Sequence, residues 1–339
     1  MKISEVKTHA KHWAEDNISN LSGFVGAYLT GSTIWKNEDE LHAPSSDVDI
    51  FIVMQTDELP AKIGKINYQN VTLEINFINF ASISDPRVIL AQYHIANAFY
   101  KDSILLDPLG QLAPILKAVK AQFAEPIWVT KRCEDARENA KNWLKVFQQA
   151  SELHDQITAL FFAAGVTTHM LLVAGLKNPT IRRRYVECNI LLQQCDYGDI
   201  CNALLTTLGS QSLSQQTVLD HLNKLNEHFT TACKVMKSPY MFAADMSMDL
   251  KSIAIGGSAE MIEAGYHREA VFWLIAIYGR SRAVIYADGS EAQLNAIDAD
   301  LWSLLNDLGI DNQQDMDIRA TMIADDIETT WQIAMKIIA

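Results

Sequence analysis

Glycine and proline are scarce in this sequence. The 339 residues include 15 glycines and 8 prolines, about half the average share of these two residues. Because both residues interrupt regular structure, their scarcity predicts long helices with few turns over much of the chain. Cysteine is also rare, and the five cysteines form no C-x-x-C pair, which argues against a zinc ribbon or a redox pair. We expect them to be free thiols in the reducing cytoplasm.

Basic residues are outnumbered, 28 against 41 acidic ones, which gives a formal net charge of −13. Proteins that bind duplexes or tRNA generally need a basic footprint for the phosphate backbone, so we expect no nucleic-acid partner. An acidic chain suits a small or cationic partner instead. The first residues, MKISEVKTHAKHWAED, are polar and mixed in charge, unlike a secretory signal. The oligomeric state is not predicted by these features.

One stretch lacks charge over a membrane-spanning length. It runs over 157–176 and reads ITALFFAAGVTTHMLLVAGL. Thr167, Thr168 and His169 lie at its middle, where hydrocarbon would tolerate them poorly. We therefore interpret it as a fully buried helix of a large helical domain and expect no membrane partner.

The first third of the chain alternates between helical and strand patterns. Val6, Ala10 and Trp13 recur on one side of an amphipathic helix, and Tyr68-Gln-Asn-Val71 is typical of a hairpin turn between two strands. The expected elements are a helix over 3–20, strands over 24–29, 48–54, 65–68 and 71–80, a helix over 87–100, a strand over 103–106 and a helix over 111–124.

After Pro126 the strand patterns largely vanish. Helical patterns follow near 132–153, 155–176, 181–196, 215–236, 258–286, 291–308 and 317–337. The sequence thus predicts an α+β protein with two domains. A mixed sheet flanked by helices occupies 1–125, and an all-helical domain occupies 126–339.

Three acids occupy strand positions among apolar residues. Asp47 and Asp49 are two residues apart, so they project to the same face, while Val48 and Ile50 face the other side. Glu74 has the same setting two strands later. If these strands are neighbours, the three carboxylates converge and repel one another, and a divalent cation removes the conflict. Carboxylates in a small open cluster suit Mg²⁺.

Gly31-Ser32 follows the first strand and opens what reads as a short helix over 33–36. Glycine lets the backbone approach a ligand closely, and N–H groups at a helix start attract phosphate. The Ser32 hydroxyl adds a further donor. A phosphate-binding turn beside metal-binding carboxylates is typical of sites that catalyse phosphoryl or nucleotidyl transfer.

The ordered motifs Thr30-Gly31-Ser32, Ser46-Asp47-Val48-Asp49-Ile50 and Leu73-Glu74-Ile75 resemble the DNA polymerase β-like nucleotidyltransferase superfamily. The resemblance implies that Asp47 and Asp49 bind two Mg²⁺ ions and a nucleoside triphosphate. It implies that Glu74 is a metal ligand, a general base or both, and that Gly31 and Ser32 hold the triphosphate. The spacer over 33–46 is slightly longer than is usual in that superfamily.

The segment Ile104-Leu-Leu-Asp107-Pro and the helix after it also resemble the bacterial aminoglycoside and lincosamide nucleotidyltransferases. This likeness implies transfer of a nucleoside monophosphate, AMP from ATP, to a hydroxyl of a small molecule such as an aminoglycoside-like antibiotic. It also implies that the helical domain contributes to the acceptor cleft.

Two other functions fit the same motifs. The chain could adenylylate a protein, as some small nucleotidyltransferases do to silence a toxin, or it could be a catalytically inactive nucleotide-binding module. Polymerase or tRNA-end addition is disfavoured by the acidic charge.

The triplet Arg182-Arg183-Arg184 admits two interpretations. It either contacts phosphate or acceptor, or forms a solvated helix face with ion pairs four residues apart, which we favour.

Overall fold

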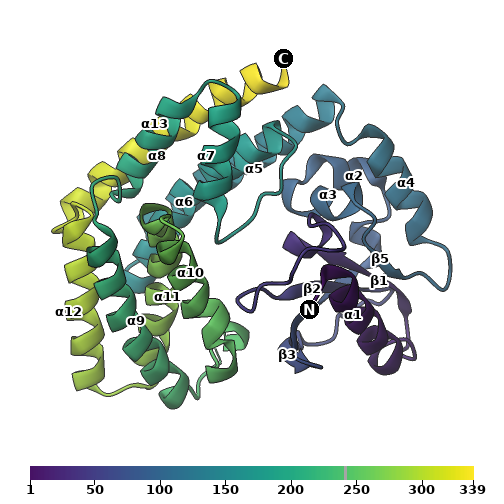
Figure 1. Ribbon diagram of the computed structural model, residues 1–339, viewed down its shortest axis with the longest axis horizontal. Helices are drawn as coiled ribbons and strands as arrows, with labels where there is room; N and C mark the ends of the chain where they lie inside the picture. Colours follow the sequence, from purple (N-terminus) through teal and green to yellow (C-terminus); the bar gives the residue numbers. More distant parts are fainter. Residues whose placement is uncertain (240–242) are drawn as a thin grey trace. The chain divides into compact units, whose positions relative to one another are not determined.

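The computed structural model describes residues 1–239 and 243–339, which form two compact units (Figure 1). The N-terminal unit consists chiefly of Met1–Asp135 and Leu176–Thr180, and the C-terminal unit chiefly of Ala136–Gly175 and Ile181–Ile337. The first unit holds a mixed sheet with flanking helices, and the regular structure of the described part of the second is helical. The predicted α+β class is therefore confirmed.

The sheet has five strands in the order β3-β4-β2-β1-β5. Strands β2 and β4 pair in parallel, and the other three pairs are antiparallel. The strands span Phe24–Thr30 (β1), Val48–Met54 (β2), Gly64–Tyr68 (β3), Val71–Asn79 (β4) and Ile104–Leu106 (β5). Each of them matches a predicted strand to within one residue at either end.

A two-residue turn joins β3 to β4, as predicted. Gln69 and Asn70 have φ angles of 50° and 65°, the left-handed pair that a tight hairpin turn requires and that asparagine tolerates well. The turn sets the register of the hairpin, in which Tyr68 faces Val71 and Lys65 faces Glu74.

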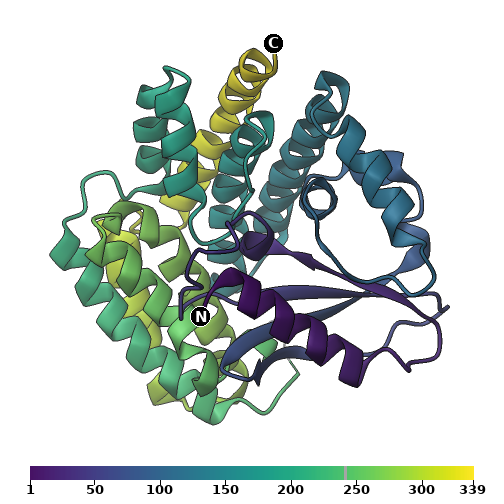
Figure 2. The same ribbon diagram turned by 45° about the vertical axis from the view of Figure 1, so that its right-hand side comes forward.

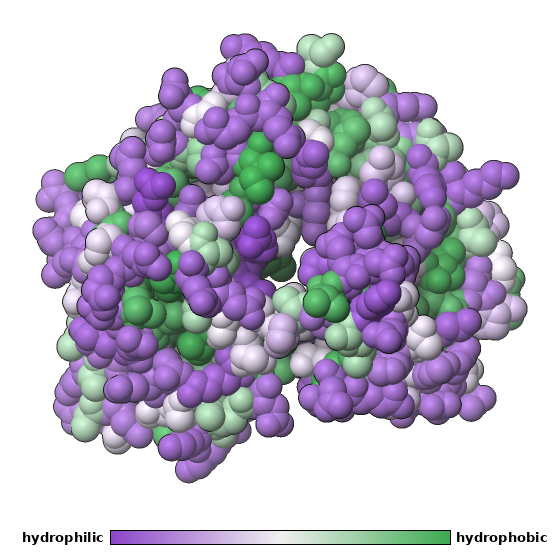
Figure 3. All heavy atoms as spheres, viewed as in Figure 1, coloured by the Kyte–Doolittle hydropathy of each residue, from purple (hydrophilic) through white to green (hydrophobic). Residues whose placement is uncertain are grey.

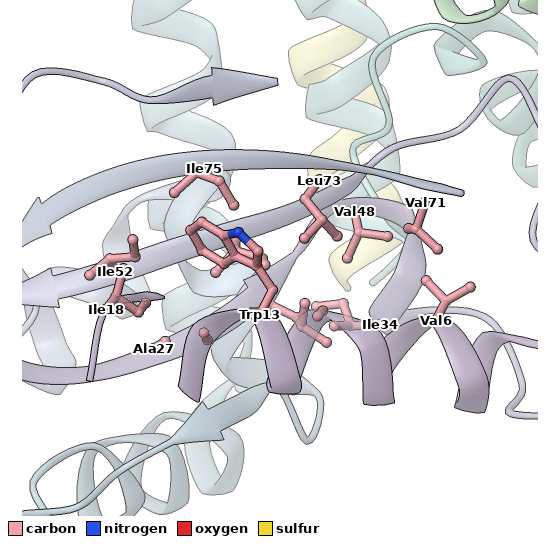
Figure 4. Close-up of a cluster of buried hydrophobic side chains, with 14 of the residues drawn as sticks. Val6, Trp13, Ile18, Ala27, Ile34, Val48, Ile52, Val71, Leu73 and Ile75 are labelled. Carbon is pink, nitrogen blue, oxygen red and sulfur yellow. The ribbon is translucent and has the colours of Figure 1, made fainter. Parts of the chain in front are cut away.

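Helix α1 (Ile3–Asn17) covers one face of the sheet (Figure 2). Its buried residues include Val6, Ala10 and Trp13, which recur at helical spacing and lie against strand residues such as Ile52 and Leu73 (Figure 4). Burying each large apolar side chain contributes about 1.5–3 kcal/mol. This core fixes the sheet from which the candidate site residues project.

Three further helices pack on the other face, around a second core. They are α2 (Pro86–Ala91), α3 (Tyr93–Tyr100) and α4 (Leu112–Gln122). The single helix expected over 87–100 is wrong, because Gln92 has extended backbone angles, φ −103° and ψ 113°, and separates α2 from α3. The start of α2 follows its sequence signals, since the Asp85 side chain accepts the Arg87 N–H at 2.8 Å.

The spacer after Gly31-Ser32 folds back onto the start of α1. The backbone N–H groups of Ile3 and Ser4 donate to the carbonyls of Glu40 and Glu38, at 2.9 and 3.1 Å. These groups have no partner inside the helix, so the spacer caps α1. The short helix expected over 33–36 is instead a 3₁₀ turn at Gly31–Ile34, which begins at the glycine itself.

The C-terminal unit is a bundle of long helices in which α11 packs against α6, α9, α10 and α12. Helix α5 (Pro126–Gln149) begins in the N-terminal unit and ends in this one. The other helices are α6 (Leu153–Ala174), α7 (Arg184–Gln194), α8 (Gly198–Leu208), α9 (Gln215–Val235), α10 (Gly257–Glu263), α11 (His267–Asp288), α12 (Glu291–Asp307) and α13 (Gln313–Ile338). Helix α8 was not predicted. The helix expected over 258–286 is two helices, because Gly265, with φ 88°, interrupts it.

Two helices, α6 and α11, are long and apolar enough to cross a membrane by length and composition. Only α6 stands out in the sequence as an uncharged run of this length. In each, 89% of the most apolar window is buried inside the structure, as in the core helices of a soluble bundle. In α11, Arg282 pairs with Asp298 at 2.6 Å. Hydrophilic side chains cover most of the surface shown in Figure 3, with hydrophobic ones in small groups.

The arginine triplet is not the solvated face that we favoured. Only Arg183 forms the expected pair, with Glu187 at 3.0 Å. Arg184 is buried and lies over an aromatic ring of α11. Arg182 donates to a carbonyl of the π-helical turn Ser252–Gly256 at 3.1 Å. Two of the three arginines therefore hold the bundle together.

Candidate metal and nucleotide site

Three carboxylates meet on two neighbouring inner strands of the N-terminal sheet, near the start of β2. Asp47 immediately precedes β2, Asp49 lies within it, and Glu74 lies on β4. Asp49 and Glu74 are direct partners across the parallel pair. One oxygen from each of the three side chains lies within 4.8 Å of the others. The structure thus brings together the three acids that the sequence reading proposed.

The acids do not disrupt the packing of the core, because successive residues of a strand point to opposite faces of the sheet. Val48 and Ile50 are fully buried in the core beneath α1, so they supply the packing that β2 needs. Asp49 projects to the opposite face and remains partly exposed. Asp49, the one polar residue of β2, can therefore serve a ligand at little cost to packing.

Gly31 lies directly against Asp49. Its φ of +70° is the left-handed conformation that glycine adopts without strain. A β-carbon at this position would stand 2.0 Å from Oδ2 of Asp49, so no other residue fits without moving the carboxylate. Ser32 follows in the same 3₁₀ turn and is half-buried. The turn and the acids thus form one local arrangement.

Two lysines complete the cluster, and the sequence reading did not identify them. Lys65 Nζ lies 3.1 Å from Oδ2 of Asp47 and also contacts Oε2 of Glu74. Lys62 Nζ lies 2.7 Å from Oε1 of Glu74. Both oxygens of Glu74 therefore accept an ammonium group. The signal for Lys65 was present, because the predicted turn at 68–71 places it opposite Glu74.

The cluster shifts the pKa values of two of its acids in opposite directions. Burial, together with the charges of Asp47 and Glu74, raises the pKa of Asp49 well above its usual range. Burial alone would raise the pKa of Glu74 too, but Lys65 and Lys62 outweigh it and lower that pKa to about 2. The lysines thus compensate Glu74, whereas Asp49 is disfavoured as a carboxylate by burial and by its acidic neighbours.

The donor set fits a small divalent cation. Three carboxylates within reach of one another supply hard oxygen ligands, which Mg²⁺ prefers, and leave coordination positions for water and phosphate. Burial and like-charge repulsion together raise the pKa of Asp49, and a bound dication would relieve the repulsion. Asp47, Asp49 and Glu74 would hold such an ion.

Comparisons with known proteins do not define a family for this chain. No protein-family model matches it, and no curated protein matches it. Among solved structures, it is similar to a nucleotidyltransferase-like protein from Exiguobacterium sibiricum. The match has 13% identity and a TM-score of 0.31, and it covers 77% of this chain and 92% of that one. Similarity of this degree does not define an activity, so the function has to be inferred from the residues of the site.

Proposed function

We propose that this protein is a Mg²⁺-dependent nucleotidyltransferase that transfers a nucleoside monophosphate, AMP from ATP, to a hydroxyl of a small molecule. The observation that carries the proposal is the convergence of Asp47, Asp49 and Glu74 beside the Gly31 turn. Carboxylates that can hold metal next to a backbone turn that can approach phosphate are the parts that nucleotidyl transfer requires.

In this proposal Asp47 and Asp49 hold the metal, and Glu74 completes the set as a ligand. The acceptor oxygen attacks the α-phosphorus, its proton leaves to solvent or a base, and the bond to the β-phosphate oxygen breaks to release pyrophosphate. A Mg²⁺ ion held by these acids would neutralise charge on the triphosphate and would lower the pKa of the acceptor hydroxyl. The protein contributes mainly position and charge, which dominate catalysis of this reaction class.

Gly31 and Ser32 hold the triphosphate in this proposal. The missing side chain of Gly31 lets the turn lie directly against the Asp49 carboxylate, so a phosphate bound at the turn would lie beside the metal-binding acids. Backbone N–H groups in such a turn, together with the Ser32 hydroxyl, suit phosphate oxygens.

The acceptor class is inferred from charge. With a formal net charge of −13, the chain attracts a cationic acceptor, and an aminoglycoside-like antibiotic has that character. A protein acceptor is the second candidate, and an inactive nucleotide-binding module is the third.

The experiment measures pyrophosphate release from MgATP with a panel of hydroxylated acceptors, cationic and neutral. We expect release with at least one acceptor and its loss in the double variant Asp47→Ala, Asp49→Ala. Asp57→Ala, in the same unit, is the matched control and should keep full activity. Full activity of the double variant would contradict the mechanism. Nucleotide binding without Mg²⁺ dependence or turnover would favour the inactive module, and an AMP-modified protein partner would favour adenylylation.

A further inference from the structure

One cation already lies inside the acidic cluster. The Lys65 ammonium bridges Asp47, which immediately precedes β2, and Glu74, which lies on β4. The side chain of Lys65 is only 8% exposed. A buried ammonium has lost most of its hydrating water and depends on carboxylates for compensation. Lys65 thus takes the place between two acids that a metal ion would also take.

The position of Lys65 is built into the fold. The two-residue turn after Tyr68 sets the hairpin register, and this register puts Lys65 directly opposite Glu74. Lys62 differs, because it precedes β3, its side chain is 47% exposed, and its described ion pair is with Glu74. The two lysines therefore form a natural comparison: a buried bridging cation and a peripheral one.

An ammonium and a dication cannot both occupy the same carboxylate oxygens. Two cations at contact distance repel strongly in a poorly solvated site, so binding of one weakens binding of the other. The triphosphate of a nucleotide offers oxygens that can accept an ammonium displaced from the acids. The arrangement thus links three charged partners: the acids, the metal and the phosphates.

Building on the proposed nucleotidyl transfer, we propose that Lys65 is a positioning residue that acts as the resident counter-cation of Asp47 and Glu74. It leaves these acids when a divalent ion binds, and it pairs with the triphosphate of the incoming nucleotide. The metal alone then binds weakly, and metal and nucleotide bind with positive coupling through Lys65. Such coupling keeps the acids neutralised until the substrate arrives.

The test is a titration with Mn²⁺, with and without α,β-methylene ATP. The electron paramagnetic resonance signal of the free ion measures how much Mn²⁺ remains unbound. In the wild type we expect weak Mn²⁺ binding that tightens about tenfold or more with the nucleotide analogue. In Lys65→Met we expect Mn²⁺ alone to bind about tenfold more tightly, with the coupling largely lost. Lys62→Met is the matched control and should keep the wild-type coupling.

If Lys65 had only a structural role, Lys65→Met would change the Mn²⁺ affinity in the opposite direction. Damage to the hairpin would weaken Mn²⁺ binding in Lys65→Met, whereas loss of a competing cation strengthens it. Lys65→Arg keeps the positive charge and should restore weak binding. Circular dichroism tests whether each variant is folded. If Lys65→Met is unfolded, Lys65→Gln replaces it in the titration.

The outcomes separate this inference from the proposed function. If the wild type binds Mn²⁺ in a way that Asp47→Asn abolishes, but a folded Lys65→Met shows unchanged affinity and coupling, the role of Lys65 is wrong and the metal site stands. If no variant binds Mn²⁺ in an Asp47-dependent way, with or without the analogue, both proposals are wrong.

Discussion

Gly31 and Asp49 are in such close contact that a β-carbon on the first would stand 2.0 Å from Oδ2 of the second. Thr30, the residue before the glycine, is also the strand partner of Asp49. The turn after β1 and the acid on β2 therefore determine each other's position. Position 31 therefore requires glycine for two reasons: its left-handed backbone angle and the closeness of the Asp49 carboxylate.

Gly31→Ala should damage both the site and the fold. A φ of +70° costs an alanine about 1–2 kcal/mol, and the new methyl group must push the Asp49 carboxylate away. We expect reduced stability in denaturant titration and a large loss of Mn²⁺ binding and of any transfer activity.

Gly110→Ala is the control for that experiment. Gly110 has nearly the same φ, +65°, but a β-carbon there would have no atom within 4 Å. Gly110→Ala should therefore lose only the stability that the left-handed backbone angle costs an alanine, and it should leave metal binding unchanged. Equal effects of the two substitutions on Mn²⁺ affinity would contradict the account of Gly31.

Asp300 should stabilise the helical unit in a pH-dependent way. It accepts from Lys224 at 2.9 Å and from His228 at 2.8 Å, both on α9. Burial by itself would raise the pKa of Asp300, but these two partners lower it below 3.8. A lowered pKa in the folded state gives stability that is present above pH 4 or so and disappears as the pH falls through the folded value.

Asp300→Asn should consequently reduce the free energy of unfolding near pH 7 by up to about 1 kcal/mol, the scale of a partly exposed ion pair. The difference from wild type should shrink as the pH falls below about 4 and through the lowered folded-state pKa of Asp300. Glu263→Gln, an exposed acid on α10, is the control. A destabilisation that is equally large at pH 3 and pH 7 would exclude the ion-pair explanation.

Cys195 should be the most reactive of the five cysteines, all of which are free. Burial raises the pKa of the Cys133 thiol to about 12 and those of Cys201 and Cys233 to about 11, and it raises the pKa of Cys188 well above its usual range. The thiolate is the reactive form, so these four react slowly at pH 8.

Labelling with dithionitrobenzoate at pH 8 should show one fast thiol in the folded protein, and Cys195→Ser should remove it. Raising the pH toward 10 should speed Cys233 and Cys201, because their thiolate fractions grow. Two or more fast thiols in the wild type at pH 8 would contradict the burial assigned to the other cysteines.

The sheet was predictable because its signals are local. Apolar runs of strand length located the strands, and Gln69-Asn70 located the hairpin. The helix boundaries were less predictable where the backbone angles of a single residue end a helix. Gln92 divides one expected helix and Gly265 divides another, although the apolar spacing continues across both breaks. Tertiary packing rather than helical periodicity determines such boundaries.

The acids were predictable from their places on or next to apolar strands, and the glycine from its place in the turn after β1. The lysines were not identified, because a lysine beside a strand usually indicates a solvated surface. Only the pairing of β3 with β4 turns Lys65 into a partner of Glu74. The positions of the arginines of the triplet depend on long-range packing, which sequence spacing does not record.

The most direct test of the proposed metal and nucleotide site is a crystal structure with Mg²⁺ and α,β-methylene ATP. We predict an ion bound to carboxylate oxygens of Asp47 and Asp49 at about 2.0–2.1 Å, with the triphosphate against the Gly31-Ser32 turn. A nucleotide bound elsewhere, with no ion on the three acids and Lys65 still bridging Asp47 and Glu74, would contradict the proposal.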